Sequence, residues 1–175
     1  LPPIATDNNY LYTMTGGFIY KFDIHNGSVV AAVATSYGMH GGGVFSPDGQ
    51  WVYFCGGKYV FKINTTTLLS SFTNVQFYNG YGTFDAILAD DMTYLNGYLY
   101  VAQDQSFGDF GIWKINADTM TWTSYETTVA YPTKYGSWGV YADEKNIYLL
   151  QPNEIWVYLN GNLDDGPIRF AISGY

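Results

Sequence analysis

Short apolar runs recur four times along the chain, and each follows a turn rich in Asp, Asn, Gly or Pro. Residues of these types reverse the chain between neighbouring strands. The runs occupy residues 10–12, 51–53, 98–100 and 146–148, so their first residues lie 41, 47 and 48 positions apart. A pattern that returns at this period predicts one structural unit used four times.

A second strand is predicted in each unit, at residues 18–23, 59–64, 112–116 and 155–160. In three of these strands a lysine (Lys21, Lys62 or Lys114) interrupts the apolar run, and an Asp or Asn closes all four. After a further turn, a last strand is predicted at residues 28–33, 68–72, 121–125 and 168–172. Strands rich in β-branched and aromatic residues at this spacing predict an all-β protein with almost no helix.

Another short apolar stretch lies before the first turn of each unit, as at residues 43–45 and 138–141, and brings the predicted strands to four per unit. Four strands in a unit of 41 to 48 residues match the blade of a β-propeller. We therefore predict a single propeller domain over residues 1–175, with four four-stranded blades at about 1–35, 36–78, 79–130 and 131–175. Middle strands covered by blades on both sides would explain the unbroken apolar run at residues 51–55. A β-sandwich or a barrel of hairpins also contains many short strands, but the fourfold repetition of one pattern argues against both.

One unit carries a recognisable motif. Residues 44–54 read Val-Phe-Ser-Pro-Asp-Gly-Gln-Trp-Val-Tyr-Phe, and a second strand with a Thr-rich turn follows at residues 59–69. This segment resembles the YVTN-type and related WD-like propeller repeats, and the other three units match by spacing and aromatic pattern. A haemopexin-like four-bladed propeller is a weaker match. The resemblance implies the fold, because such propellers serve as enzymes, binders and surface-layer structures alike.

Composition excludes several classes of protein. The 175 residues carry a net charge of −8 and are 47% hydrophobic, 19% aromatic and 13% charged. Seven Lys and Arg against fifteen Asp and Glu exclude a general nucleic-acid-binding surface. The apolar content excludes disorder, and the sequence has no run of roughly 20 apolar residues that could span a bilayer.

The compartment is predicted from composition and short motifs. The chain begins Leu-Pro-Pro without Met, which fits a processed mature protein or a segment of a longer one. Asn26 and Asn64 stand in N-glycosylation motifs within predicted turns. The single cysteine, Cys55, lies in an apolar strand and is expected to be a buried small side chain. Together with the low Lys content, these features favour a secreted glycoprotein, extracellular or at the cell surface.

The connections between units share a Tyr-Gly pair, at residues 37–38, 81–82 and 135–136. In a propeller such connections run from the outer strand of one blade to the inner strand of the next, so they gather on one face. We predict a binding or assembly face there, formed by Tyr37, Tyr78, Tyr81, Phe84, Tyr135 and Trp138. The alternative is that Tyr-Gly only forms the corner between two blades.

Residues with catalytic potential are sparse. His40 begins a His-Gly-Gly-Gly segment like that of some esterases, but no Gly-x-Ser-x-Gly motif accompanies it, and His25 lies in a turn. The acidic groups at residues 90–91, 104–109 and 164–165 lack the spacing of a calcium loop and are interpreted as turn residues. Asp85 is the conspicuous acid near the predicted channel. We predict no catalytic residue, metal site, nucleotide motif or cofactor.

Two function classes remain. The favoured one is a non-catalytic extracellular structural or adhesive propeller, a self-assembling surface or filament subunit whose partners are further copies, other surface proteins or glycans. The alternative is a ligand-binding or enzymatic propeller, carbohydrate-active or lactonase-like. The sequence also leaves open whether four blades close into a ring by packing or form part of a larger repeat assembly.

Overall fold

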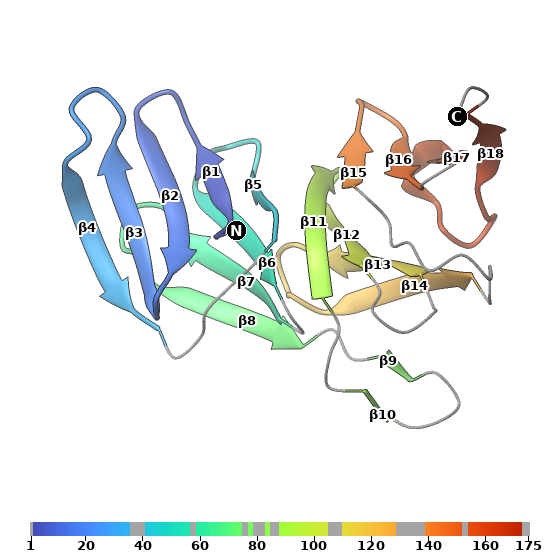
Figure 1. The fold of residues 1–175 in the computed structure, drawn as a ribbon, viewed down its shortest axis with the longest axis horizontal. Helices are drawn as coiled ribbons and strands as arrows, with labels where there is room; N and C mark the ends of the chain where they lie inside the picture. The colour runs from blue at the N-terminus through green and yellow to red at the C-terminus, as the bar shows by residue number, and fades with distance from the viewer. Residues whose placement is uncertain are drawn as a thin grey trace.

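The computed structural model describes residues 2–35, 41–56, 59–74, 77–78, 83–84, 88–104, 110–128, 139–151 and 154–172. Within these residues the chain forms four antiparallel sheets, and each sheet is a meander of four strands in sequence order. The all-β prediction and the prediction of four four-stranded units are therefore confirmed (Figure 1).

The sheets are numbered along the chain. Sheet 1 contains β1 (Ile4–Thr6), β2 (Tyr10–Thr15), β3 (Phe18–Asp23) and β4 (Val29–Ala34). Sheet 2 contains β5 (Gly43–Phe45), β6 (Trp51–Gly56), β7 (Tyr59–Asn64) and β8 (Ser70–Asn74). Sheet 3 contains β11 (Leu88–Leu95), β12 (Tyr98–Asp104), β13 (Phe110–Asn116) and β14 (Trp122–Thr128). Sheet 4 contains β15 (Gly139–Ala142), β16 (Ile147–Leu150), β17 (Glu154–Tyr158) and β18 (Ile168–Ala171).

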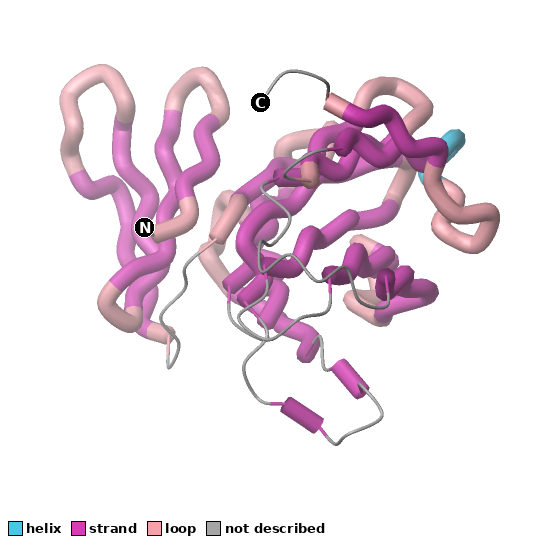
Figure 2. The backbone as a smooth tube through the Cα atoms, turned by 45° about the vertical axis from the view of Figure 1, so that its right-hand side comes forward, coloured by secondary structure: helices cyan, strands magenta, loops and turns pink. Residues whose placement is uncertain are grey.

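Two small elements were not predicted. A two-stranded hairpin, β9 (Phe77–Tyr78) with β10 (Thr83–Phe84), lies in the connection between sheets 2 and 3. In the described part of the chain the helical structure is one 3-10 turn, η1 (Leu159–Gly161), drawn in cyan in Figure 2. Among the same residues no helix is long and apolar enough to cross a membrane.

Carboxylates close the turns between the first and second strands of three sheets. The Oδ1 atoms of Asp7, Asp48 and Asp143 each accept a backbone N–H two residues later. Sheet 3 uses Asn96 and Gly97 instead, with φ of 49° and 84°, which is the left-handed pair of a type I′ hairpin turn. The turn residues recognised in the sequence therefore form these turns by known local chemistry.

Alternation along the middle strands explains their unbroken apolar runs. In β6, Val52 and Phe54 pack against sheet 1, whereas Tyr53 and Cys55 pack against sheet 3. Because successive side chains of a strand point to opposite faces, a strand with a sheet on each side must be apolar at every position. Cys55 is fully buried, as the sequence predicted.

Each core lies between two neighbouring sheets rather than inside one. The three described clusters join sheet 1 to sheet 2, sheet 2 to sheet 3, and sheet 3 to sheet 4. The largest fully buried side chains at these junctions include Tyr12, Phe54, Tyr53 and Tyr100. Stability of a sheet therefore depends on the sheet beside it, which is the physics of stacked repeats.

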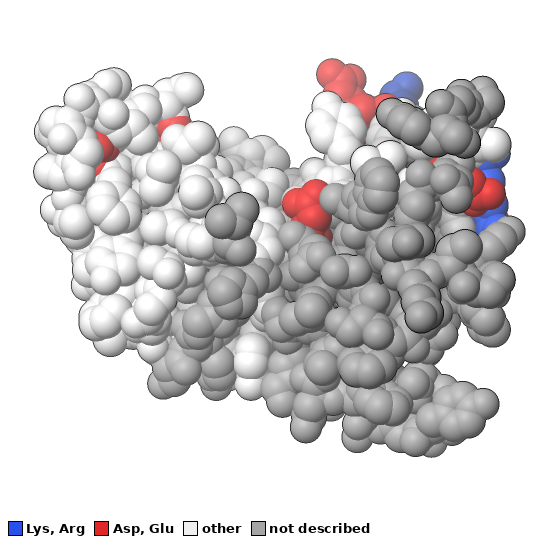
Figure 3. Space-filling model, in the orientation of Figure 1, with Lys and Arg blue, Asp and Glu red and all other residues white. Residues whose placement is uncertain are grey.

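The sheets follow one another around an arc. The inner strands β1, β5, β11 and β15 are neighbours in that order. Figures 1 and 2 show sheets 1 and 4 at the two ends of this arc, standing apart from each other. The space-filling view is hollowed between these two ends (Figure 3). The described residues thus form an open arc of four sheets.

We expect the turn carboxylate of sheet 4 to make stability depend on acidic pH. Hydrogen bonds from Tyr148 and from the backbone N–H groups of Asn146 and Lys145 lower the pKa of Asp143 from 3.8 to about 2. Because the folded state binds fewer protons, this stabilisation is complete above pH 4 and is lost as the pH falls toward 2.

The variant Asp143→Asn keeps a side-chain oxygen that can accept the backbone N–H groups but has no titrating group. Melting temperatures of both proteins measured from pH 6 to pH 2 should show a steeper fall for the wild type below pH 4. Parallel curves over the whole range would contradict the assignment.

Candidate interaction surfaces

Most residues of the predicted Tyr-Gly face lie outside the described part of the chain. This holds for Tyr37, Tyr81, Tyr135 and Trp138. The backbone of Tyr78 lies in β9 and that of Phe84 in β10, which pair with the register Thr83↔Tyr78 and Phe84↔Phe77. The structure therefore brings Tyr78 and Phe84 into one hairpin, and the aromatic face remains a prediction.

The two glycosylation motifs lie in the turns where the sequence placed them. Asn26 is exposed between β3 and β4, and its Oδ1 accepts the N–H of Ser28 at 2.8 Å. Asn64 ends β7, and its Oδ1 accepts the N–H groups of Thr66 and Thr67 at 3.0 and 2.9 Å. In both turns the side-chain oxygen of the asparagine accepts backbone hydrogen bonds. Glycosylation at either asparagine remains a prediction.

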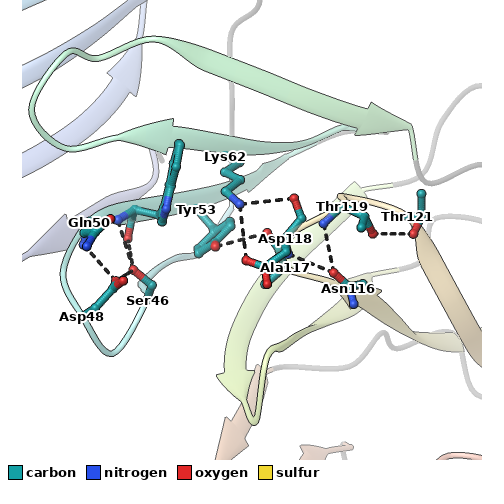
Figure 4. A network of polar contacts seen from close by, with 11 residues as sticks. Ser46, Asp48, Gln50, Tyr53, Lys62, Asn116, Ala117, Asp118, Thr119 and Thr121 are labelled. Carbon is teal, nitrogen blue, oxygen red and sulfur yellow. Dashed lines mark hydrogen bonds and ion pairs between the residues drawn. The ribbon is translucent and has the colours of Figure 1, made fainter.

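A repeated polar contact joins each sheet to the next, and we call it the tyrosine–lysine clamp. A Tyr of the second strand and a Lys of the third stand directly opposite each other on the face toward the next sheet. Both donate hydrogen bonds to backbone carbonyl groups in the third turn of that sheet, between its last two strands. Figure 4 shows the contact from sheet 2 to sheet 3.

The clamp recurs along the chain with similar hydrogen-bond distances. From sheet 1, Tyr12 Oη and Lys21 Nζ reach the carbonyl of Thr65 at 3.3 and 3.0 Å. From sheet 3, Tyr100 Oη and Lys114 Nζ reach the carbonyl of Gly161 at 2.7 and 3.0 Å.

From sheet 2, the clamp uses two adjacent acceptors. Tyr53 Oη donates to the carbonyl of Ala117 and Lys62 Nζ to that of Asp118, both at 3.3 Å. A fully buried carbonyl without a partner would cost about 1–3 kcal/mol, so the clamp removes a penalty that close packing would otherwise create.

Aromatic rings hold each lysine in place. Lys21, Lys62 and Lys114 lie over the rings of Tyr10, Trp51 and Tyr98, with Nζ 4.0, 4.4 and 4.6 Å from the ring centroids. Such cation–π contacts stabilise by about 0.5–1 kcal/mol when exposed and more when desolvated. The lysine that interrupts the apolar strand in these three sheets therefore joins its sheet to the next one. The sequence pattern alone did not indicate this role.

Burial changes the acidity of the clamp residues. It raises the pKa of Tyr12 and of Tyr100 to about 12 and raises that of Tyr53 as well. The same desolvation lowers the pKa of Lys114. The tyrosines therefore stay protonated as hydrogen-bond donors throughout the neutral range.

Two of the three turns that receive a clamp carry a buried apolar residue in the left-handed region. Leu68 in sheet 2 and Met120 in sheet 3 have φ of 56° and 57°, and both are buried. An L-residue in this region costs about 1–2 kcal/mol, which burial of a large apolar side chain offsets. The equivalent residue in sheet 1 is Gly27, which adopts φ of 72° without this strain.

Sheet 4 has no clamp on its outer face. Val157 pairs with Tyr148 at the position where the other sheets have the clamp lysine. Asn146 stands where the other sheets have the aromatic ring that contacts that lysine. Tyr148 Oη donates instead to Asp143 Oδ2 of its own sheet, at 2.6 Å. The corresponding turn of sheet 1 receives no clamp among the described residues, and its Ile24 is 44% exposed where Thr65 and Ala117 are buried.

Both ends of the arc therefore present apolar sheet faces. On the outer face of sheet 4, Tyr141, Ile168 and Phe170 are 67%, 47% and 54% exposed. On the outer face of sheet 1, Ile4 and Val29 are 57% and 54% exposed. Neighbouring sheets cover the equivalent faces elsewhere in the arc, so these two are the strongest candidate interaction surfaces in the described part of the chain.

Asp91 joins three inner strands. Its Oδ2 accepts the N–H of Val140 in sheet 4 at 3.0 Å, and its Oδ1 accepts the N–H of Met92 at 2.9 Å. Gly42, the residue before β5, lies so close that a Cβ there would come within 2.5 Å of Asp91 Oδ1. Burial raises the pKa of Asp91, although both backbone hydrogen bonds oppose the shift. These contacts make Asp91 a structural link between sheets.

Asp164 and Asp165 lie in a turn, as the sequence predicted, whereas Asp90 and Asp91 lie in β11 and Asp104 ends β12, so the interpretation of these three acids as turn residues was wrong. Asp165 Oδ2 accepts a hydrogen bond from Asn162 Nδ2 at 2.7 Å, and the N–H of Asp164 binds Asn162 Oδ1. Across the described ranges, the side chains of His, Cys, Asp and Glu form no group of three that could hold a metal ion. His40 and Asp85 lie outside these ranges.

Comparison with solved structures establishes the fold. The structure of U3-55K matches with a TM-score of 0.66 and 11% identity, over 97% of this chain and 51% of that chain. The RRP9 WD40 repeats match with a TM-score of 0.66 and 11% identity, over 97% and 50%. The dihydro-heme d1 dehydrogenase NirN matches with a TM-score of 0.68 and 19% identity, over 98% and 37%.

The chain has the β-propeller fold. At these identities the matches show the fold alone, and the chain spans about half or less of the length of each matched protein. The four sheets are therefore blades of a partial propeller. No family model and no curated protein matches the sequence. The matched proteins include WD40 repeats and a dehydrogenase, so the likeness does not select one function.

Gly161 provides a direct test of how tightly the clamp is packed. A Cβ on Gly161 would overlap with Tyr100 Oη, whereas one on Gly166 would meet nothing within 4 Å. Both glycines have positive φ, 62° and 70°, so alanine strains the backbone equally at both. In urea unfolding, Gly161→Ala should therefore cost about 1–3 kcal/mol more than the control Gly166→Ala. Equal losses of unfolding free energy in the two variants would show that the junction can accommodate a Cβ at Gly161.

The shared acceptor at Gly161 predicts non-additive substitutions. Tyr100→Phe or Lys114→Met leaves one donor on the Gly161 carbonyl, whereas the double variant leaves none. We expect the double loss of unfolding free energy to exceed the sum of the single losses by about 1 kcal/mol.

The junction between sheets 2 and 3 provides the control, because Tyr53 and Lys62 use different carbonyls. Tyr53→Phe and Lys62→Met should be closer to additive. An additive result at both junctions would contradict the role given to the shared carbonyl.

Proposed function

We propose that the chain is a non-catalytic structural or adhesive protein of the extracellular space or cell surface, which works by associating with further copies of itself. The observation that carries this proposal is the pair of uncovered apolar faces on blades 1 and 4. Large contiguous apolar surfaces on a protein in water mark sites where another protein docks.

The use of charge within the blades supports a structural role. Lys21, Lys62 and Lys114 serve the clamps, Asp143 and its equivalents serve turns, and Asp91 links inner strands. Figure 3 shows that the end of the arc formed by blade 1 carries few charges, while acidic and basic side chains gather over blade 4. A surface with few like charges has little electrostatic repulsion to overcome when copies meet.

The extracellular setting rests on composition and on the two glycosylation motifs. Asn26 is exposed in the turn after β3, where an attached glycan would meet solvent. Tyrosine, of which the chain has 18, provides large contact area at a small cost in side-chain entropy. Both features suit an extracellular protein that acts through contacts made by its surface.

Sedimentation velocity of the purified chain, from micromolar to high micromolar concentration at neutral pH, tests the proposal. We expect a species heavier than the 19.6 kDa chain that gains population with concentration. High salt should leave the association intact, because the contact is apolar rather than ionic. A single 19.6 kDa species at every concentration would refute self-association.

A further inference from the structure

We infer that the outer face of blade 4 packs against the outer face of blade 1 of a second copy. The inference rests on the proposed function and names the surface through which the copies meet. That surface differs from the Tyr-Gly face predicted from the sequence.

Cross-strand pairing defines the face that blade 4 presents. Tyr141 pairs with Tyr148, Ile155 with Phe170, and Val157 with Ile168, so these side chains share one side of the sheet. Trp156 and Tyr158 point to the other side and pack against blade 3. The outer face is thus the continuation of the faces that carry the clamps in blades 1, 2 and 3.

Blade 1 presents the complementary kind of face. Its Ile19 and Lys21 point toward blade 2, so Phe18, Tyr20 and Phe22 point outward. The three rings form a ladder with successive centroids 5.7 Å apart. At the internal junctions, aromatic and aliphatic residues of this kind, such as Phe54 and Phe61, are buried by the preceding blade.

The two end faces differ from the internal junctions in matching ways. Blade 4 carries Val157 where the other blades carry the clamp lysine. Blade 1 carries the apolar Ile24, 44% exposed, at the turn position that receives the clamp elsewhere. The clamp acceptor is a backbone carbonyl, which Ile24 has as Ala117 does, so the difference lies on blade 4, where Val157 has no amino group that needs an acceptor. The outer face of blade 4 is therefore suited to an apolar partner face such as that of blade 1.

The shape of the arc fits the same arrangement. The four described sheets form an open arc with blades 1 and 4 at its two ends (Figure 1). A blade 4 to blade 1 contact joins two different surfaces, and two such contacts related by a twofold axis would join two copies into a dimer.

Single charges on the end faces test the inference. Tyr141→Glu on blade 4 and Ile4→Glu on blade 1 each place an unpaired carboxylate in the proposed contact. Each should weaken dimerisation in sedimentation velocity by roughly a hundredfold or more. Leu69→Glu is the matched control, because Leu69 is 70% exposed in a turn of blade 2, away from both end faces. It should leave the dimer intact.

Mixing the two variants identifies the pairing. A Tyr141→Glu chain retains a normal blade 1, and an Ile4→Glu chain retains a normal blade 4, so one unmodified contact forms between them. The mixture should therefore contain heterodimers although neither variant dimerises alone. Circular dichroism and melting curves of each variant confirm that the arc itself remains folded.

The outcomes separate this inference from the proposed function. If both variants still associate like the wild type, copies meet elsewhere, and the inference fails while self-association stands. If only one variant loses dimerisation, like faces meet like faces, and the blade 4 to blade 1 contact is wrong. If the wild type remains monomeric at every concentration, both the proposed function and the inference fail.

Discussion

The structure depends on one constraint, which is that no blade of this propeller can bury both of its faces without neighbours. Side chains alternate across each middle strand, so Val52 and Phe54 need blade 1 while Tyr53 and Cys55 need blade 3. The tyrosine–lysine clamp donates hydrogen bonds to backbone carbonyls that this close packing would otherwise leave without a donor. At the ends of the arc, the outer faces of blades 1 and 4 have no neighbouring blade among the described residues. The proposed association would cover these two faces.

Much of the fold could be predicted because its signals are local. Turn residues such as Asp7 and the Asn96–Gly97 pair act through neighbours two or three positions away, and strands alternate along a short window. The burial of Cys55 followed from the same pattern. The hairpin of β9 and β10 was missed, because two residues per strand leave no periodic signal to detect.

The interaction surfaces could not be predicted in the same way, since they depend on pairing between distant residues. Lys21 was noticed as an interruption of an apolar strand, but its partner Thr65 lies 44 positions away. The absence of the lysine from the fourth unit was visible in the sequence, as Val157 in the position of Lys114. Its meaning required the register that sets Val157 opposite Tyr148 and the arc that leaves this face at one end.

Hydrogen exchange of backbone amides at two protein concentrations tests the central claim most directly, because local opening reports how well each blade is covered. In dilute solution we predict faster exchange in β3 of blade 1 and β17 of blade 4 than in β7 and β13 of the inner blades. In concentrated solution the end blades should gain protection while the inner blades stay unchanged. Equal protection of all four blades, independent of concentration, would contradict the account.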